Sequence, residues 1–295
     1  MSHAIFIFGA GEAGKAALKY LQNDFQVLGF VDNDTTKQAN KLAGLTVHAP
    51  EELLKMQFDY IYVASEFFEQ IERQLQTELA INVNKIRILP AHAIKGIQLG
   101  NTEANQNALK LLAIVTETLN KDNVAYYVDA GTLLGIVRDN ALIPWDDDLD
   151  IAINSTDTDK CFQSITSLLE RLELEFNTPW ELFINKARND YNSIHKGDCA
   201  SFKLRPIKAQ RKLAQLDVFI KYVDEELMHY VISSRGFTMP SSHLLTTEKY
   251  QFNNITLNLP SNATSYLATH YGDDWQTPKK DWNLSMIKSA TVFES

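Results

Sequence analysis

The sequence predicts an α/β protein of two domains, and three features support that prediction. A glycine-rich turn follows a short apolar segment near the N-terminus, strand-like and helix-like segments alternate over the first third of the chain, and a cluster of aspartates lies near its middle. A chain of 295 residues, of which 45% are hydrophobic and 22% are charged, is long enough to build two cores. We therefore expect a parallel α/β domain followed by an α+β domain.

The first domain begins with a glycine pattern between a strand and a helix. Residues 3–8 predict the strand, residues 15–21 predict the helix, and the turn between them carries Gly9, Gly11 and Gly14. In dinucleotide-binding folds, glycines at this spacing form the tight turn and bring the phosphates to the helix N-terminus. The pattern predicts a site for NAD or a nucleotide sugar, although the same glycines also serve a tight turn and helix packing alone.

The alternation of strands and helices continues after this turn. Residues 25–31 predict a strand that ends before Asp32, about twenty residues beyond the glycines, where such folds place the acid that accepts a ribose hydroxyl. Residues 60–64 predict a third strand, 67–79 a helix and 86–89 a last strand. This order indicates a parallel sheet with right-handed crossovers, so the domain is predicted to be Rossmann-like.

A polar connection marks the boundary between the two domains. Gly96 and Gly100 precede the polar residues 101–107, and apolar residues then recur at helical spacing. We place a Rossmann-like nucleotide-binding domain at residues 1–95 and a catalytic domain at residues 96–295.

The aspartate cluster lies in a strand-like segment. Alternate residues of a strand share a face, so Asp146, Asp148 and Asp150 would project together while Asp147 points away. Like charges on one face repel unless a cation or protons relieve them, and Mg²⁺ or Mn²⁺ prefers carboxylate oxygens. A solvated acid-rich turn is the alternative, but the apolar residues that follow favour a metal site.

A Gly-Thr pair and an arginine precede the acids. Gly131 and Thr132 could bring backbone N–H groups and a hydroxyl to a phosphate. Arg138 could pair with a phosphate through its planar guanidinium, or instead form a salt bridge to Asp139 or Asp147. These residues predict a phosphate site opposite the metal.

Residues 131–153, GTLLGIVRDNALIPWDDDLDIAI, resemble the LicD/fukutin-like family of phosphoryl-alcohol transferases almost residue for residue. The resemblance implies a nucleotidyltransferase fold, whose signature of a glycine pair, a short helix and two acids separated by an apolar residue is similar to this segment. Two later segments also resemble the family, QLDVFI at residues 215–220 and YGDDW at residues 271–275. The resemblance covers roughly the last two-thirds of the chain and is far more specific than a glycine fingerprint.

The resemblance also implies roles for individual residues. Asp148 and Asp150, with Asp146, would hold the metal on the donor phosphates. Asp217 would complete the metal shell or accept the proton of the attacking hydroxyl. Lys203 lies where family members often carry a basic residue and is a candidate phosphate ligand, with an ordinary surface lysine as the alternative.

The first domain carries a resemblance of its own. The segment GAGEAGK at residues 9–15 and the segment GFVDND at residues 29–34 look like the nucleotide-binding leader of sugar-modifying and polysaccharide-assembly enzymes. Hydride chemistry is not expected, because the domain lacks a Tyr-Lys pair and a second half.

Composition excludes several classes of partner. A formal net charge of −9 and a pI near 5.3 argue against binding to nucleic acid or to an anionic membrane. Cys161 and Cys199 suggest neither a disulfide framework nor a zinc site, so a reducing cytoplasm is expected. Residues 4–8 are too short for a membrane span and lack the basic leader of a signal peptide. A membrane-bound acceptor would be reached from the cytosolic side.

Motif and resemblance together predict a transferase. It would move phosphocholine, glycerol phosphate or ribitol phosphate from a CDP-linked donor to a hydroxyl of a surface glycan or lipid-linked sugar, as in lipopolysaccharide or capsule, and release CMP. The acids predict the metal chemistry, whereas the resemblance implies the donor. Two alternatives stay open: a nucleotidyltransferase that moves NMP from an NTP with release of pyrophosphate, and a nucleotide-sensing protein without catalysis.

Overall fold

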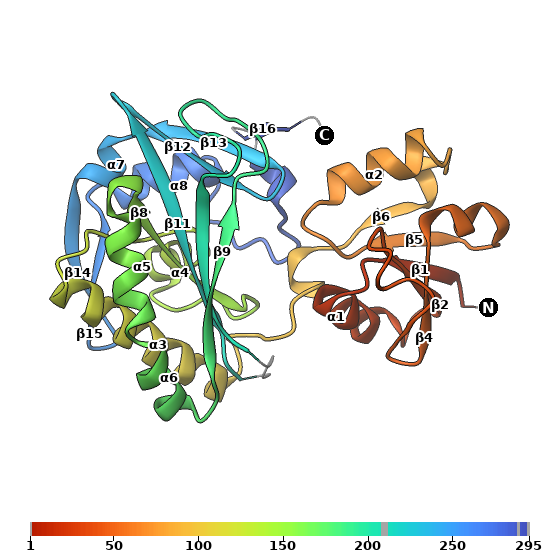
Figure 1. Cartoon of the computed structure of the whole chain (residues 1–295), viewed down its shortest axis with the longest axis horizontal. Coiled ribbons are helices and arrows are strands. Elements are labelled where there is room, and N and C mark those ends of the chain that lie inside the picture. The colour runs from red at the N-terminus through yellow and green to blue at the C-terminus, as the bar shows by residue number, and fades with distance from the viewer. Residues whose placement is uncertain (1, 208–211, 288–289, 294–295) are drawn as a thin grey trace. The chain divides into compact units, whose positions relative to one another are not determined.

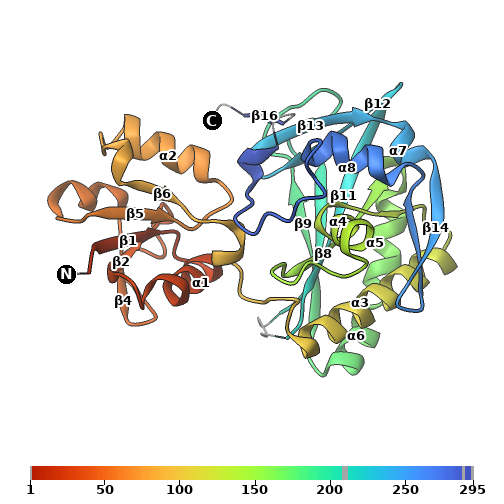
Figure 2. The same ribbon diagram turned by 180° about the vertical axis from the view of Figure 1, so that it is seen from behind.

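The computed structural model describes residues 2–207, 212–287 and 290–293, and the chain divides into two compact units (Figures 1 and 2). The first unit holds the chain up to Gly96 together with Lys279–Leu284. The second holds Ile97–Pro278 together with the described residues between Ser285 and Phe293.

The first unit is a sheet with the strand order β3-β4-β2-β1-β5-β6. All neighbouring strands are parallel except β3, which forms an antiparallel hairpin with β4. Counted in chain order, the parallel strands are arranged 3-2-1-4-5, which is the order of a doubly wound fold without its last strand, so the predicted Rossmann-like sheet is confirmed. Its elements are β1 (Ala4–Phe8), α1 (Glu12–Leu21), β2 (Gln26–Val31), β3 (Lys41–Leu42), β4 (Leu45–His48), η1 (Pro50–Lys55), β5 (Tyr60–Val63), α2 (Phe68–Thr77), η2 (Val83–Lys85), β6 (Ile86–Ile88) and η3 (Ala91–Ala93).

Strand β1 has apolar side chains on both faces, as a central parallel strand requires. Phe6 and Phe8 pack with the buried residues of α2, whereas Ile5 and Ile7 pack with those of α1. The two helices therefore cover opposite faces of the sheet, and the turn between β1 and α1 lies at the carboxyl edge of the central strand.

The second unit is built on a larger mixed sheet with the order β16-β13-β12-β11-β10-β9, to which β8 and β7 are joined through β11. Strand β11 runs parallel to β8 and antiparallel to β10 and β12. Helix α4 packs on β8 and α8, α3 packs on β8 and α5, and α6 packs on β9. The predicted α+β domain is confirmed.

The elements of the second unit follow in chain order. They are α3 (Thr102–Lys121), β7 (Tyr127–Val128), α4 (Ala130–Asp139), β8 (Asp148–Asn154), η4 (Ser155–Asp157), α5 (Thr158–Thr166), α6 (Leu169–Phe176), β9 (Trp180–Lys186), β10 (Cys199–Pro206), β11 (Gln215–Asp224), β12 (Leu227–Ile232), β13 (Arg235–Pro240), α7 (Ser242–Leu245), β14 (Thr247–Phe252), β15 (Ile255–Pro260), α8 (Ala263–Tyr271) and β16 (Thr291–Val292). A further 3-10 helix, η5, spans Leu284–Met286.

The acidic strand is shorter than the sequence predicts. Strand β8 begins at Asp148, and the chain before it turns, because the N–H of Asp146 donates to the carbonyl of Ile143 at 3.0 Å. The alternation of a strand therefore does not apply to Asp146 and Asp147. The expectation that Asp147 points away from its neighbours is wrong, since carboxylate oxygens of Asp146, Asp147 and Asp148 all lie within 4.8 Å of one another.

Long apolar helices do not occur in the described part of the chain. Among residues 2–207, 212–287 and 290–293, no helix is both long enough and apolar enough to cross a bilayer.

Candidate active site

The register between β8 and β11 brings two predicted acids together. Asp150 is the direct partner of Asp217 in this parallel pair, and Asp148 lies two residues before Asp150 on the same face. Asp150 is 6% exposed and Asp217 is 4% exposed. The structure thus places Asp148, Asp150 and Asp217 on one face of the sheet, with the turn residues Asp146 and Asp147 beside Asp148.

Crowding and burial have a clear electrostatic consequence for Asp150. Burial raises the pKa of its carboxyl well above the ordinary value, and the neighbouring carboxylates of Asp148, Asp146, Asp217 and Asp129 raise it further. Without a cation, the protonated form of the Asp150 carboxyl is therefore favoured over the charged form. A divalent cation would remove that cost, so the acid cluster is suited to hold one.

Gly131 lies in the first turn of helix α4, beside the acids. A Cβ at this position would lie 2.5 Å from Asp146 Oδ2 and 3.4 Å from Asp150 Oδ2. Glycine is therefore what allows the two carboxylates to approach the helix N-terminus, where the dipole favours negative charge. The close approach that the sequence predicts at Gly131 is present, and in this structure the protein's own carboxylates make it.

Thr132 is tied to the acidic strand. Its hydroxyl oxygen accepts a hydrogen bond from the Asp150 N–H at 2.8 Å, and its own N–H donates to Asp150 Oδ2 at 3.2 Å. The side chain is buried. The two residues fix the start of α4 against β8, so the hydroxyl serves this contact and is not displayed to solvent.

The two predicted basic residues differ in their surroundings. Asp148, Asp150 and Asp217 on the shared face of β8 and β11 form what we call the acid row. Lys203 Nζ forms an ion pair with Asp217 Oδ2 at 2.9 Å, which places its ammonium beside this row. Arg138 instead forms a salt bridge with Asp139, with Nη2 to Oδ2 at 2.7 Å. The helical rise puts Arg138 about 10 Å along α4 from Gly131. The structure therefore brings Lys203 to the acids and directs the Arg138 guanidinium to its neighbour.

A buried ion pair that lies next to the Gly131 turn was not predicted from the sequence. Lys221 Nζ lies 2.8 Å from Asp129 Oδ2, and both side chains are only 1% exposed. Asp129 also caps α4, because its Oδ1 accepts from the Ala130 N–H at 2.7 Å and from the hydroxyl of Tyr266. A lone lysine in the apolar strand LDVFIKYV is the one signal in the sequence for such a pair.

The charges of this pair are set by opposing effects. Burial alone would raise the pKa of Asp129, but the Lys221 ammonium brings it below the ordinary value. Burial lowers the pKa of Lys221, and Asp129 partly opposes that change. Ala130, next to the cap, has a left-handed φ of 43°, which an alanine adopts only at a cost. The Asp129 contacts hold this strained residue and with it the Gly131 turn.

Aromatic residues enclose the ion pair. The Tyr230 hydroxyl lies 2.8 Å from His270 Nδ1, and the Lys221 ammonium lies 3.2 Å from the centre of the Tyr230 ring. Burial lowers the pKa of His270 to about 4, so the imidazole is neutral at physiological pH. This buried network includes Asp129, the N-cap residue of α4, and so holds the start of the helix next to Gly131.

The predicted nucleotide site in the first unit has a different construction. Gly9 has a φ of 116°, and a Cβ on Gly14 would lie 2.0 Å from the Gly9 carbonyl oxygen. Both glycines are therefore required by the turn itself. A Cβ on Gly11 would meet nothing within 4 Å among the described residues, so of the three glycines of this turn Gly11 is the one that leaves open space.

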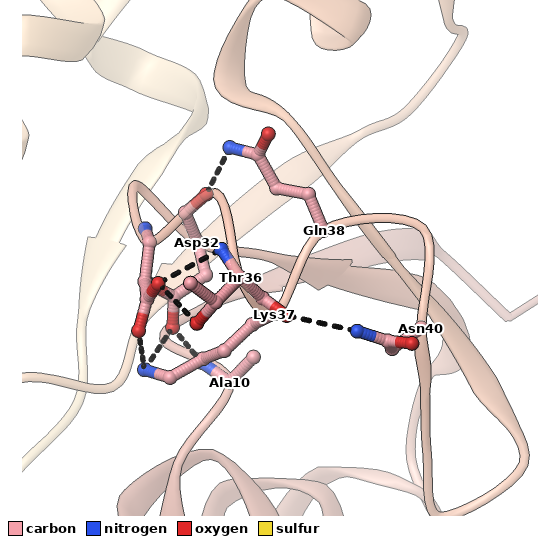
Figure 3. A network of polar contacts seen from close by, with 7 residues as sticks. Ala10, Asp32, Thr36, Lys37, Gln38 and Asn40 are labelled. Atoms are coloured by element: carbon pink, nitrogen blue, oxygen red, sulfur yellow. Dashed lines mark hydrogen bonds and ion pairs between the residues drawn. The ribbon is translucent and has the colours of Figure 1, made fainter.

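Asp32 is engaged by its own domain (Figure 3). Its Oδ2 accepts from the Ala10 N–H at 2.7 Å and lies 3.1 Å from Lys37 Nζ, and its Oδ1 accepts from the Asp34 N–H at 2.9 Å. The carboxylate thus clamps the loop after β2 to the glycine turn. A ribose hydroxyl would have to share it with these donors.

Comparison with known families agrees with the fold and the acidic site. Residues 123–262 match the LicD/FKTN/FKRP nucleotidyltransferase domain, and residues 1–88 match the C2185-like N-terminal domain. The fold, the glycine turn and the paired acids agree with this match to a nucleotidyltransferase domain. Residues 123–262 are thus similar to the LicD/fukutin-like family, as the sequence motifs indicate.

Two relatives illustrate the similarity in sequence. An uncharacterized protein of Rickettsia typhi, RT0683, is 40% identical over 173 residues, which are 57% of this chain and 47% of that protein. The human ribitol-5-phosphate transferase FKTN is 24% identical over 184 residues, 60% of this chain and 35% of that protein. The chain therefore spans about half or less of the length of these relatives.

Solved structures show weaker similarity. ANT(2")-Ia in complex with adenylyl-2"-tobramycin is 15% identical, with a TM-score of 0.34, over 61% of this chain and 84% of that one. UDP-D-quinovosamine 4-dehydrogenase from Vibrio fischeri is 20% identical, with a TM-score of 0.26, over 30% of this chain and 80% of that one. These scores are too low to carry an argument about function.

Proposed function

We propose that the protein is a metal-dependent phosphoryl-alcohol transferase. It would move a group such as phosphocholine, glycerol phosphate or ribitol phosphate from a CDP-linked donor to a hydroxyl of a glycan or lipid-linked sugar. The observation that carries this proposal is the pairing of Asp150 with Asp217 across β8 and β11, beside Asp148 and the Gly131 turn. The match of residues 123–262 to the LicD/FKTN/FKRP nucleotidyltransferase domain supports the class of group transferred.

The acids suit Mg²⁺ or Mn²⁺. The cluster offers only hard carboxylate oxygens, and those of Asp146, Asp147 and Asp148 lie within 4.8 Å of one another. Asp146, Asp148 and Asp150 would hold the cation, with Asp217 as a further ligand. When bound, it would neutralise charge on the donor phosphates.

The remaining groups would handle the phosphate and the proton. The acceptor oxygen bonds to the phosphorus that carries the alcohol, and the bond from that phosphorus to CMP breaks. Asp217 would take the proton of the attacking hydroxyl if it does not bind the cation. Lys203, ion-paired to Asp217, would orient a phosphate oxygen of the donor.

The first unit would bind a nucleotide at its glycine turn. Gly11 supports this role, since among the described residues a side chain there would meet nothing within 4 Å. NAD and a nucleotide sugar are the ligand classes to test. We place the protein in the cytoplasm, acting at the cytosolic face of the membrane on its acceptor.

A product assay tests the proposal. The purified protein with Mg²⁺ is incubated with CDP-choline, CDP-glycerol, CDP-ribitol, CDP-ethanolamine or NTPs, and mass spectrometry detects CMP or pyrophosphate. We expect CMP from one CDP-alcohol, and loss of at least about 10³-fold of that rate in Asp148→Asn. Asp139→Asn, which alters an acid outside the row, is the matched control and should retain activity. Pyrophosphate from an NTP, or full activity of Asp148→Asn, would contradict the proposal.

A further inference from the structure

The row of paired residues that contains the acids continues to an aromatic ring. Asp150 on β8 pairs with Asp217 on β11, and Asp217 pairs with Lys203 on β10. Lys203 in turn pairs with Phe183 on β9. Residues paired directly across neighbouring strands project from the same face of a sheet. Two acids, a lysine and a phenylalanine therefore lie in line on the face that carries the acidic cluster.

The ring at the end of this row is exposed but held in place. Phe183 is 45% exposed. The Arg205 guanidinium carbon lies 4.9 Å from its ring centre, and Arg205 Nε donates to Glu181 Oε1 at 2.9 Å. A cation packed on a ring and anchored by a carboxylate fixes the ring at little cost in side-chain entropy. The ring is thus arranged in advance for contact with a planar group.

The charged side chains around the Phe183 ring indicate that the planar group is attached to an anion. Lys203 is next to Phe183 in the row, and Arg205 lies two residues from Lys203 on the same face. Of the five N–H groups of a guanidinium, the Glu181 contact uses one. An aromatic ring bordered by a lysine and an arginine, in line with a metal-binding row, suits a planar ring carried by phosphates.

We propose that Phe183 is the stacking platform for the base of the donor nucleotide, whose phosphates pass Lys203 and Arg205 toward the acids. This inference rests on the proposed function. With about 5 Å between strands, Phe183 lies about 5 Å from Lys203 and about 10 Å from Asp217 along the row. A nucleoside diphosphate presents base, ribose and phosphates in that order. The acceptor offers a sugar hydroxyl for the reaction and no planar aromatic ring, so the base of the donor fits this position better.

The test compares two neighbouring residues of β9 with opposite orientation. Phe183→Ala removes the platform, and Ile184→Ala is the matched control, because Ile184 is similarly exposed at 41% and projects from the other face. Calorimetry with Mg²⁺ measures binding of CDP and, separately, of inorganic pyrophosphate, which has no base. Phe183→Trp serves as the conservative variant and as a fluorescent reporter.

We expect Phe183→Ala to weaken CDP binding by about tenfold or more and to leave pyrophosphate binding within about twofold. Ile184→Ala should change neither, and CDP should quench the fluorescence of Phe183→Trp while that variant keeps its affinity. Unchanged CDP affinity in Phe183→Ala, with normal binding by the wild type, would overturn this inference and leave the proposed function standing. Failure of the wild type to bind both CDP and pyrophosphate would instead overturn the proposed function.

Discussion

The two glycine turns of this protein look alike in sequence and differ in what fills the space beside them. In the first unit, Gly9 and Gly14 are needed because the turn packs on itself, with the Gly9 carbonyl 2.0 Å from a Cβ on Gly14. In the second unit, the space at Gly131 is filled by carboxylates of Asp146 and Asp150 from later in the chain. A glycine in a turn therefore indicates a functional site only when the atoms that lie beside it are known.

The two turns also differ in what lies behind them. The first unit supports its turn with apolar packing around Ile5 and Ile7 and with the exposed loop that Asp32 clamps. The second unit supports Gly131 with the fully buried pair of Asp129 and Lys221. Buried charge is costly unless it is paired, so the second turn depends on a small number of strong contacts and the first on many weak ones. Four changes test this contrast, from the largest expected effect to the smallest.

Removing one member of the buried pair should have the largest effect. Asp129→Asn leaves the Lys221 ammonium buried without its countercharge, and we expect the free energy of unfolding to fall by about 3–5 kcal/mol. Urea denaturation measures the change. The double variant Asp129→Asn with Lys221→Met should lose less than Asp129→Asn alone. If the losses of stability caused by Asp129→Asn and by Lys221→Met simply added in the double variant, the two residues would act independently. The Gly131 turn would then not depend on their pairing.

Acid should weaken the second unit through His270. Its pKa is lowered by burial from 6.5 to about 4 in the folded protein, so between these values the unfolded chain binds a proton that the folded chain does not. The stability contributed at neutral pH is lost as the pH falls through this window, by roughly 3 kcal/mol in all.

Urea denaturation between pH 7.5 and 4.5 checks this effect. His270→Gln should show a flatter dependence than the wild type. His195→Gln is the control, because the His195 side chain is 77% exposed, and it should follow the wild type. Parallel profiles for wild type and His270→Gln would refute the assignment.

A methyl group at Gly131 should separate activity from stability. The obstacle in Gly131→Ala is the movable carboxylate of Asp146, 2.5 Å from the new Cβ, so we expect the acid to shift while the fold survives. The transfer rate should fall by roughly 10- to 100-fold, with a melting temperature within a few degrees of the wild type. Gly96→Ala, where a Cβ has open space within the described residues, is the matched control. Full activity in Gly131→Ala would show that the approach of the carboxylates is not needed.

The smallest effects compare Gly14 with Gly11. Gly14→Ala meets a backbone carbonyl, and we expect a loss of at least about 1–3 kcal/mol of stability. Gly11→Ala should stay within about 0.5 kcal/mol of the wild type, because its Cβ has open space in the described structure. Calorimetric titration with NAD and nucleotide sugars should then show weaker binding in Gly11→Ala. Equal titration curves for wild type and variant would make the first unit a scaffold.

Local pattern predicted strands β1, β2, β5 and β6 of the first unit but missed the hairpin of β3 and β4, and the family resemblance, not local pattern, brought Asp217 to the acids of β8. Apolar runs and glycine spacing depend on neighbours in sequence, and the acids of β8 and β11 each lie in an apolar strand whose parity fixes the face. The orientation of Asp147 was predicted wrongly because the turn before β8 interrupts that parity, whereas Asp146 does lie with Asp148. The predicted roles of Thr132, Arg138 and Asp32 in ligand binding stay predictions, and their contacts within the protein were not foreseen beyond the Arg138–Asp139 pair.

The buried network could not be predicted for a different reason. Asp129 meets Tyr266 across 137 residues of sequence, and no local period links them. Contacts of this kind depend on how α8 and β11 pack around α4, which is decided by tertiary structure. An isolated lysine at position 221 of an apolar strand indicates that a partner exists but does not identify it.

The central claim is that the acid row of the second unit binds a divalent cation. Titration of the protein with Mn²⁺, followed by electron paramagnetic resonance, measures this directly in the wild type, in Asp150→Asn and in the control Asp139→Asn. We predict a bound Mn²⁺ in the wild type and in Asp139→Asn, and at least about tenfold weaker binding in Asp150→Asn. Equal Mn²⁺ binding by Asp150→Asn and the wild type would contradict the claim.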